Sequence, residues 1–172
     1  MLGIFLDIET NGLDPFTHNP LELSFVIKKL KTMEQLTSYD TLIIPSIEEW
    51  EKSNKESLKF TKITLETLKE SGKKKDVVKK EIIHMFKEYN ISRENSVFIC
   101  QNPSFDRAFF SKIIDVETQE NLNLPYHWLD LASMYLSRRL AKSNDYTLNL
   151  SKDAIAKDLG LPEEEKPHRA RN

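Results

Sequence analysis

The chain has 172 residues, of which 39% are hydrophobic and 30% charged, and its formal net charge is −2. A single globular domain of this length can bury a sizeable core. The near-neutral charge excludes binding of nucleic acid through a global positive field, so any phosphate contacts must be local or metal-mediated. The single cysteine, Cys100, excludes an intrachain disulfide, and no apolar run approaches the length of a membrane span. We therefore expect a cytoplasmic protein without a membrane partner.

The N-terminal segments predict strands that form a meander. Residues 2–7 are a short apolar run without periodicity, which is typical of a buried central strand. Asn11-Gly12 and Asp14-Pro15 then indicate a loop. Residues 21–31 and 39–44 have the composition of two further strands, separated by a polar stretch. The early part of the sheet is therefore expected to be largely antiparallel.

The rest of the chain alternates helical patterns with one strand. The apolar residues of 73–90 recur at helical spacing and predict an amphipathic surface helix, whereas 96–101 reads as a buried strand. A helix over 103–114 follows, with Ser104 as its N-cap. Two more helices are expected at 131–140 and 150–159, the second ended by Gly160 and Pro162. Strands followed by alternating helices and a strand indicate an α/β fold around a mixed sheet.

Two acids, Asp7 and Glu9, lie at the end of the first predicted strand. In an extended chain, residues two apart leave the same face about 7 Å from each other, so both carboxylates can share a cation. Acids at strand ends are most often simply solvated. Asp7, however, follows five apolar residues, and its ionised form is costly there unless a cation or hydrogen bonds compensate. The sequence therefore favours a metal site.

Three segments, in this order along the chain, resemble the motifs of the DEDD, or DnaQ-like, 3′→5′ exonuclease family. The third motif includes His168, which indicates the histidine (DEDDh) branch. The resemblance spans residues 7–170, nearly the whole chain. The matching segments are Asp7-Ile8-Glu9-Thr10-Asn11-Gly12-Leu13-Asp14-Pro15, Gln101-Asn102-Pro103-Ser104-Phe105-Asp106-Arg107-Ala108-Phe109-Phe110, and Asp158-Leu159-Gly160-Leu161-Pro162 followed by Pro167-His168-Arg169-Ala170.

The resemblance implies an RNase H-like fold, with a five-stranded mixed sheet flanked by helices. It also implies two Mg²⁺ or Mn²⁺ ions, which suit a reaction that must neutralise charge on both the attacking and the leaving oxygen. By analogy, Asp7 bridges both ions, Glu9 holds the one nearest the attacking water and Asp106 completes the second. His168 is implied as the general base.

Further positions resemble those that contact the terminal nucleotide in the family, with Leu13 as a wedge between bases and Phe105 nearby. Taken singly, such residues are more often packing groups. Asp130 could be mistaken for a metal ligand, but a helix-capping role fits its position better. The implied substrate-binding residues are Thr10, Gly12, Leu13, Asn102 and Phe105.

One departure from the family pattern concerns its fourth acid, an aspartate five residues after the motif histidine. This sequence ends at Asn172, four residues after His168. We therefore expect residues 1–172 to be a single exonuclease domain that is incomplete at its C-terminal end. The alternative is a domain that has lost this ligand and is catalytically weakened.

Together, these patterns predict a metal-dependent 3′→5′ exonuclease that hydrolyses single-stranded DNA or RNA ends to nucleoside 5′-monophosphates, in DNA proofreading or repair or in RNA processing. Two alternatives stay open. One is a catalytically silent domain of the same fold that binds nucleic acid or protein. The other is an oligoribonuclease-like enzyme that trims RNA, because sugar choice depends on contacts near the 2′ position. A polymerase partner and a homodimer are both left open.

Overall fold

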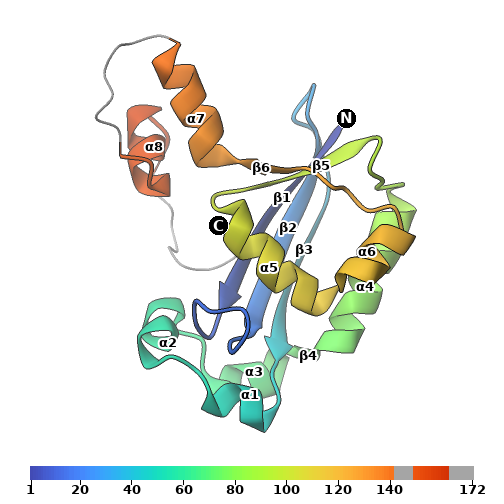
Figure 1. The fold of residues 1–172 in the computed structure, drawn as a ribbon, viewed down its shortest axis with the longest axis vertical. Helices are drawn as coiled ribbons and strands as arrows, with labels where there is room; N and C mark the ends of the chain where they lie inside the picture. The colour runs from blue at the N-terminus through green and yellow to red at the C-terminus, as the bar shows by residue number, and fades with distance from the viewer. Residues whose placement is uncertain (142–148, 163–172) are drawn as a thin grey trace.

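The computed structural model describes residues 1–141 and 149–162. In this part of the chain, one mixed sheet with the strand order β4-β3-β2-β1-β5-β6 is flanked by helices, as Figure 1 shows. The predicted α/β, RNase H-like fold is thus confirmed. The sheet has six strands where five were expected. The additional strand is β4 (Lys73–Lys74), a two-residue segment that pairs in parallel with the end of β3 immediately before a helix begins.

The first three strands form the predicted antiparallel meander: β1 (Leu2–Thr10), β2 (Pro20–Lys29) and β3 (Gln35–Ile44). The last of them begins at Gln35, four residues earlier than the hydrophobic pattern indicated. Its polar first residues pair with the end of β2 through the backbone, which does not require apolar side chains. The strands β5 (Ser96–Cys100) and β6 (Trp128–Asp130) then extend the sheet parallel to β1.

Three short helices follow the meander, and hydrophobic periodicity did not predict them. They are α1 (Ile47–Glu51), α2 (Lys55–Thr61) and α3 (Leu65–Ser71). Helices of five to seven residues complete at most two turns, so no apolar stripe can repeat along them. Each nevertheless begins at a capping side chain, respectively Ser46, Asn54 and Thr64. The same holds for α6 (Val116–Asn121), which begins after Asp115.

The four helices that were predicted from the sequence are all present: α4 (Lys75–Glu88), α5 (Pro103–Ile113), α7 (Leu131–Leu140) and α8 (Lys152–Asp158), the last shorter than the expected 150–159. The expected cap of α5 was wrong, because Asn102 occupies the N-cap position and proline takes the first helical position after it. Ser104 instead donates from Oγ to Asn102 Oδ1 at 2.6 Å. Beyond α8, Gly160 has a φ of 67°, the left-handed conformation that ends many helices.

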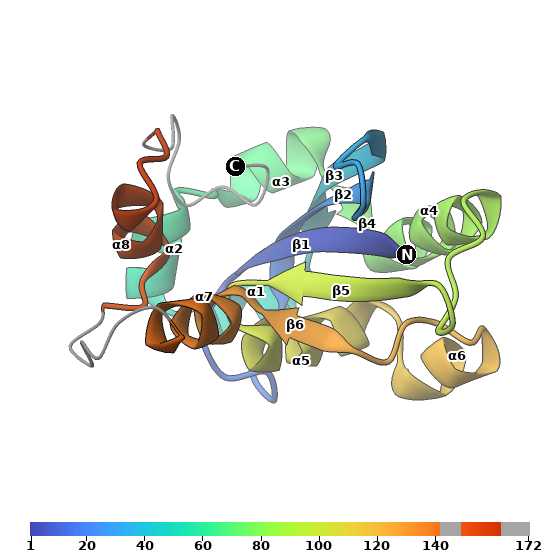
Figure 2. The same ribbon diagram turned by 90° about the horizontal axis from the view of Figure 1, so that it is seen from above.

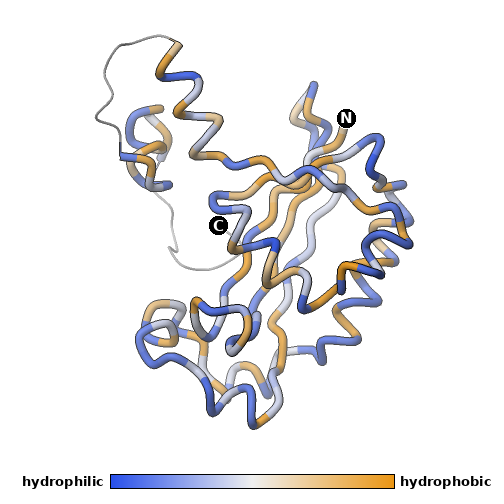
Figure 3. Tube along the Cα trace, viewed as in Figure 1, coloured by the Kyte–Doolittle hydropathy of each residue, from blue (hydrophilic) through white to orange (hydrophobic). Residues whose placement is uncertain are grey.

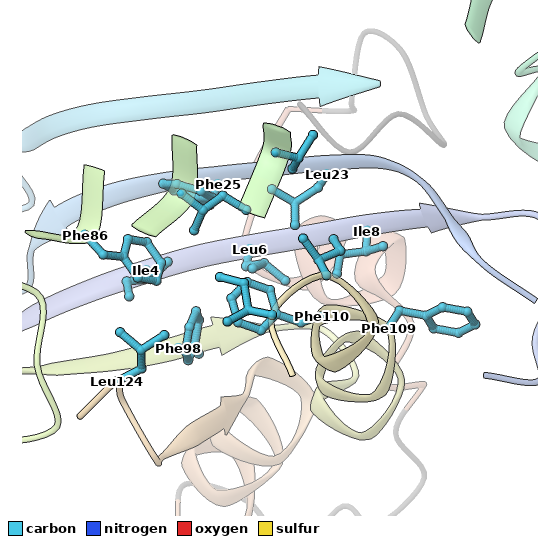
Figure 4. Packing of buried hydrophobic residues seen from close by; sticks show 14 of the residues in the cluster. Ile4, Leu6, Ile8, Leu23, Phe25, Phe86, Phe98, Phe109, Phe110 and Leu124 are labelled. Carbon is cyan, nitrogen blue, oxygen red and sulfur yellow. The ribbon is translucent and has the colours of Figure 1, made fainter. Parts of the chain in front are cut away.

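The main core lies between one face of the sheet and the helices α4 and α5. Alternate residues of β1, namely Ile4, Leu6 and Ile8, are buried on this face, and Figure 4 shows them together with Phe86 of α4 and Phe110 of α5. Figure 3 shows the hydrophobic residues gathered on the central strands, while much of the surrounding chain is hydrophilic. Because side chains alternate along a strand, the odd-numbered residues of β1 point away from this core.

None of the helices in residues 1–141 and 149–162 combines the length and the apolar composition needed to cross a membrane.

Replacing Phe98 by alanine should lower the free energy of unfolding by about 3–5 kcal/mol, because a large buried ring is lost and leaves a cavity. Phe98 is fully buried, and its ring stacks on Trp128 at 4.0 Å and meets the edge of Phe110 at 5.3 Å. Urea unfolding of both proteins measures the difference. The matched control is Phe16→Ala, since that ring is 94% exposed and its loss should change stability by less than about 0.5 kcal/mol. Equal effects of both substitutions would contradict this placement of the core.

Candidate active site

The strands β1, β5 and β6 all end on the same side of the molecule, where α2, α7 and α8 lie (Figure 2). A pocket of about 450 Å³ opens on this side. It is formed by the end of β1 and the loop after it, by α2, and by the junction between β5 and α5. The lining residues are Asp7, Ile8, Glu9, Thr10, Leu13, Glu56, Ser57, Phe60, Thr61, Gln101, Asn102, Phe105 and Asp106.

The acids Asp7 and Glu9 both line this pocket from within β1, which continues to Thr10. The burial of β1 alternates, and both acids are half-buried on the face opposite the core residues. They therefore share one face, as their spacing indicated. Sequence reasoning missed Glu22, a buried acid that lies directly opposite Glu9 in the antiparallel pairing of β1 with β2. Opposed residues of an antiparallel pair point to the same side, so Glu22 adds a third carboxyl group to this face.

The structure brings Asp106 to the same pocket from the first turn of α5. Its side chain is buried, and its Oδ1 atom has no hydrogen-bond partner among the described residues. Burial, and then the negative charge of Asp7, raise the pKa of Asp106 from 3.8 to about 7. Hydrogen bonds from the backbone N–H groups of Asp106 and Ile8 act in the opposite direction. A cation that replaces the proton of this buried carboxyl group would stabilise its ionised form.

A buried thiol, Cys100, lies at the end of β5 beside Asp106. Burial and the charges of Asp106 and Asp7 raise the pKa of this thiol far above its usual value. Because the thiolate is the reactive form of cysteine, Cys100 stays an inert packing group at neutral pH. Cys100 is therefore a small residue of the core.

The loop between β1 and β2, residues 11–19, forms one edge of the pocket. Thr10 Oγ1 donates to the carbonyl of Gly12 at 2.7 Å, and Leu13, which is 77% exposed, projects at the rim. A Cβ atom at Gly12 would lie 2.2 Å from the ring of His18, so only glycine allows this close approach. Gly12 thus shapes the loop but is not itself among the lining residues.

Two of the sequence-predicted substrate residues come from the junction between β5 and α5. Asn102 occupies the N-cap position of α5, and Phe105, one turn later, packs against Phe109 with ring centroids 4.8 Å apart. Both residues line the pocket, as do Thr10 and Leu13.

One wall of the pocket comes from α2, which sequence reasoning did not connect with the site. The ring of Phe60, 55% exposed, and the side chain of Thr61 belong to this wall, together with Glu56 and Ser57. The available signal was Asn54, whose side chain accepts hydrogen bonds from the backbone N–H groups of the next turn. That signal could have located the helix, but not its place beside β1.

Asn11 fixes this wall relative to β1. Its Nδ2 atom donates to the Glu49 carbonyl and to Ser53 Oγ, both at 3.0 Å. Its own carbonyl accepts from the backbone N–H of Asn54 at 2.8 Å. On the other side of the pocket, Gln101 Nε2 donates to the Leu150 carbonyl at 3.0 Å and so anchors the segment that leads into α8.

The expected capping role of Asp130 is confirmed. Its carboxylate accepts from the backbone N–H groups of Ala132 and Ser133, both at 3.1 Å, at the start of α7. Asp130 does not line the pocket. His168, the expected general base, lies outside the described residues.

The donor set of the pocket suits a divalent cation. Within residues 1–141 and 149–162, no three His, Cys, Asp or Glu side chains form a ready-made metal-binding group. Asp7, Glu9 and Asp106 nevertheless line the same pocket, and one buried oxygen of Asp106 has no partner in this part of the chain. Carboxylate oxygens are the ligands that Mg²⁺ and Mn²⁺ prefer. The residues present therefore fit such an ion.

The described residues thus combine an RNase H-like architecture with an acidic pocket beside the end of its central strand β1. The chain belongs to the exonuclease family RNase_T, whose model matches residues 4–172. A comparison with curated proteins finds no sequence match.

Solved structures share the fold at low sequence identity. Exonuclease I of E. coli in complex with a dT13 oligonucleotide has a TM-score of 0.73 and 16% identity, over 98% of this chain and 38% of that one. Exonuclease I of Methylocaldum szegediense has a TM-score of 0.74 and 16% identity, over 96% and 37%. For cell-death related nuclease 4 (CRN-4), the TM-score is 0.74 and the identity 12%, over 99% and 58%. The chain thus spans less than two thirds of each of these proteins.

Proposed function

We propose that this protein is a metal-dependent 3′→5′ exonuclease that shortens single-stranded nucleic acid and releases nucleoside 5′-monophosphates. The observation that carries the proposal is the convergence of Asp7, Glu9 and Asp106 on one pocket from two distant segments of the chain. Membership of the exonuclease family supports the same reaction class. Several carboxyl groups gathered in one pocket destabilise a folded protein unless a bound cation or a function compensates their repulsion.

The three carboxylates are the side chains that would hold two Mg²⁺ or Mn²⁺ ions. When bound, two such ions neutralise the charge that develops on the attacking and leaving oxygens of a phosphodiester. Asp106 must release its proton before it can act as a ligand, and its raised pKa makes this step sensitive to pH near neutrality. We assign to His168 the acceptance of a proton from the attacking water, since an imidazole exchanges protons near neutral pH.

The remaining walls of the pocket suit the terminal nucleotide of a single strand. A volume of about 450 Å³ lies in the range of small-ligand sites. The partly exposed side chains of Leu13, Phe60 and Phe105 provide apolar surface against which a base can stack, and base stacking tolerates any sequence. We assign to Thr10 and Asn102, which line the same pocket, contacts that hold the end of the strand. Gly12, which does not line the pocket, acts indirectly by shaping the loop that carries Leu13. The complexes of Exonuclease I with dT13 and dA16 oligonucleotides support the choice of a single strand.

Product analysis on single-stranded DNA and RNA tests the proposal. With Mn²⁺, a 5′-labelled strand should shorten in single-nucleotide steps, whereas a 3′-labelled strand should release labelled mononucleotide at once. Addition of EDTA should stop both. Equal rates in EDTA would contradict the metal requirement, and release from the 5′ end would contradict the polarity. Binding of the strand without any cleavage would instead favour a catalytically silent binding domain.

A further inference from the structure

The tip of the β1–β2 loop, residues 14–18, is held mainly by bonds within itself. The Asp14 carboxylate accepts from the backbone N–H of Phe16 at 3.0 Å and from Thr17 Oγ1 at 2.9 Å. The Asp14 carbonyl also accepts from the backbone N–H of His18 at 2.8 Å. These bonds give the tip a defined internal shape. They do not, however, fix where the tip lies relative to the pocket.

Lys112, in the last turn of α5, provides that connection. Its Nζ atom donates to the Pro15 carbonyl at 2.9 Å and, through a short hydrogen bond, to the His18 carbonyl. In the part of the chain that the structure describes, no other group from outside the loop hydrogen-bonds to residues 14–18. A single ammonium group thus bridges the two ends of the tip, because it carries three donors.

The surroundings of Lys112 act on its charge in both directions. Burial and the positive charge of Lys75 lower the pKa of Lys112, whereas Glu49 in α1 and Asp14 in the loop act as opposite charges that raise it. The last turn of a helix also favours a positive side chain, since its free carbonyl groups carry partial negative charge. A neutral side chain of similar length would provide neither the donors nor the charge.

The helix that carries this lysine also carries Asp106 in its first turn. The two residues are six positions apart, or about 9 Å along the helix axis. Both the buried Asp106 and the exposed Leu13, which is next to the tip, line the pocket. Through Lys112, α5 therefore sets the distance between a carboxylate of the site and the loop that borders it.

We infer that Lys112 is a positioning residue for substrate, which holds the β1–β2 loop so that Leu13 meets the terminal nucleotide. The inference rests on the proposed exonuclease function and adds a residue that no motif resemblance indicated. Lys112 does not line the pocket, so it acts through the loop rather than on the reacting atoms.

Replacement of Lys112 by methionine removes the donors and keeps most of the side-chain volume. The rate of amide exchange at Phe16 and His18 should rise by about tenfold or more, because the loop tip loses its attachment. For a 3′-labelled oligonucleotide, KM should rise about tenfold while kcat changes less than about threefold, since the carboxylates stay in place. Lys112→Arg should restore much of both, as a guanidinium can also donate to two carbonyl groups.

The matched control is Lys79→Met. Lys79 donates to Asp115 at 2.7 Å and to Thr118 at 3.1 Å, so it also ties two elements together, but far from the pocket lining. This substitution should leave loop exchange and KM unchanged. Unchanged loop exchange in Lys112→Met would overturn the inference, as would a loosened loop with unchanged KM. Amide exchange needs no turnover, so an inactive wild-type protein would overturn the proposed function while the loop attachment is still measured.

Discussion

Substitution of Asp7 by asparagine is expected to lower the rate of nucleotide release by roughly 10³-fold or more. Asp7 lines the pocket with Glu9 and Asp106, and its negative charge acts directly on Asp106. Neutralising it removes attraction for both proposed cations, which contribute several kcal/mol to transition-state stabilisation. Each 1.4 kcal/mol or so corresponds to a factor of ten in rate, so a thousandfold loss represents roughly 4 kcal/mol. Single-turnover release of a 3′ label with saturating Mn²⁺ measures the effect.

The same substitution has a second readout that does not depend on activity. The charge of Asp7 is one of the two causes that raise the pKa of Asp106, so this pKa should fall in Asp7→Asn. A carboxyl NMR titration of the metal-free protein follows it. Asp76→Asn, an equal loss of charge on the exposed first turn of α4, is the matched control and should leave both rate and titration unchanged. Near-normal turnover of Asp7→Asn would contradict the proposed metal ligation.

The second large effect is expected at Asp106, where asparagine should abolish turnover and yet stabilise the metal-free protein at pH 8. In the folded state, the pKa of this carboxyl is raised from 3.8 to about 7, so the folded protein holds the proton more strongly than the unfolded chain does. Its contribution to stability is fully present below about pH 4 and is lost as the pH rises to about 7. The free energy of unfolding that is lost in this way is on the order of 4 kcal/mol at most. Asparagine carries no charge and removes this dependence.

Urea unfolding in EDTA at pH 5 and pH 8 tests the expectation. The wild-type protein should be clearly less stable at pH 8, whereas Asp106→Asn should show a much smaller difference. Mn²⁺ at a hundredfold excess over its dissociation constant should add about 2.7 kcal/mol to the wild type and much less to the variant. Asp130→Asn is the control, because asparagine caps a helix as well as aspartate does. A parallel pH dependence in all three proteins would show that Asp106 does not carry the raised pKa.

The fold was predictable where the sequence pattern is local and long. The continuous apolar run of β1 and the helical spacing of α4 each determine one element, and both were placed within a few residues. The position of the N-cap of α5 was harder to predict from the sequence. There, Pro103 moved the cap from Ser104 to Asn102, because proline is favoured at the first helical position. For the short helices α1 to α3, only the capping residues in the sequence could have indicated where a helix begins.

The acids of the site were indicated by motif resemblance, and the structure brings Asp7, Glu9 and Asp106 to one pocket. The pocket wall formed by α2 could not be predicted from motif resemblance. Phe60 reaches the pocket because Asn11 binds α1 and the start of α2, a contact that depends on tertiary packing rather than on spacing. Lys112 and Pro15 are 97 positions apart, and neither residue type suggests the other as its partner.

Asp106 lies far along the chain from Asp7 and Glu9, and this separation affects how the pocket forms during synthesis. Asp7 and Glu9 belong to β1, while Asp106 follows β5, whose pairing with β1 closes a loop of about ninety residues and costs roughly 4 kcal/mol in chain entropy. The meander of β1, β2 and β3 contains only neighbouring strands and can pair as it leaves the ribosome. A nascent chain that has not yet released α5 therefore holds only part of the acidic pocket. The set of three carboxyl groups proposed to hold the metal ions is therefore completed only after α5 has left the ribosome.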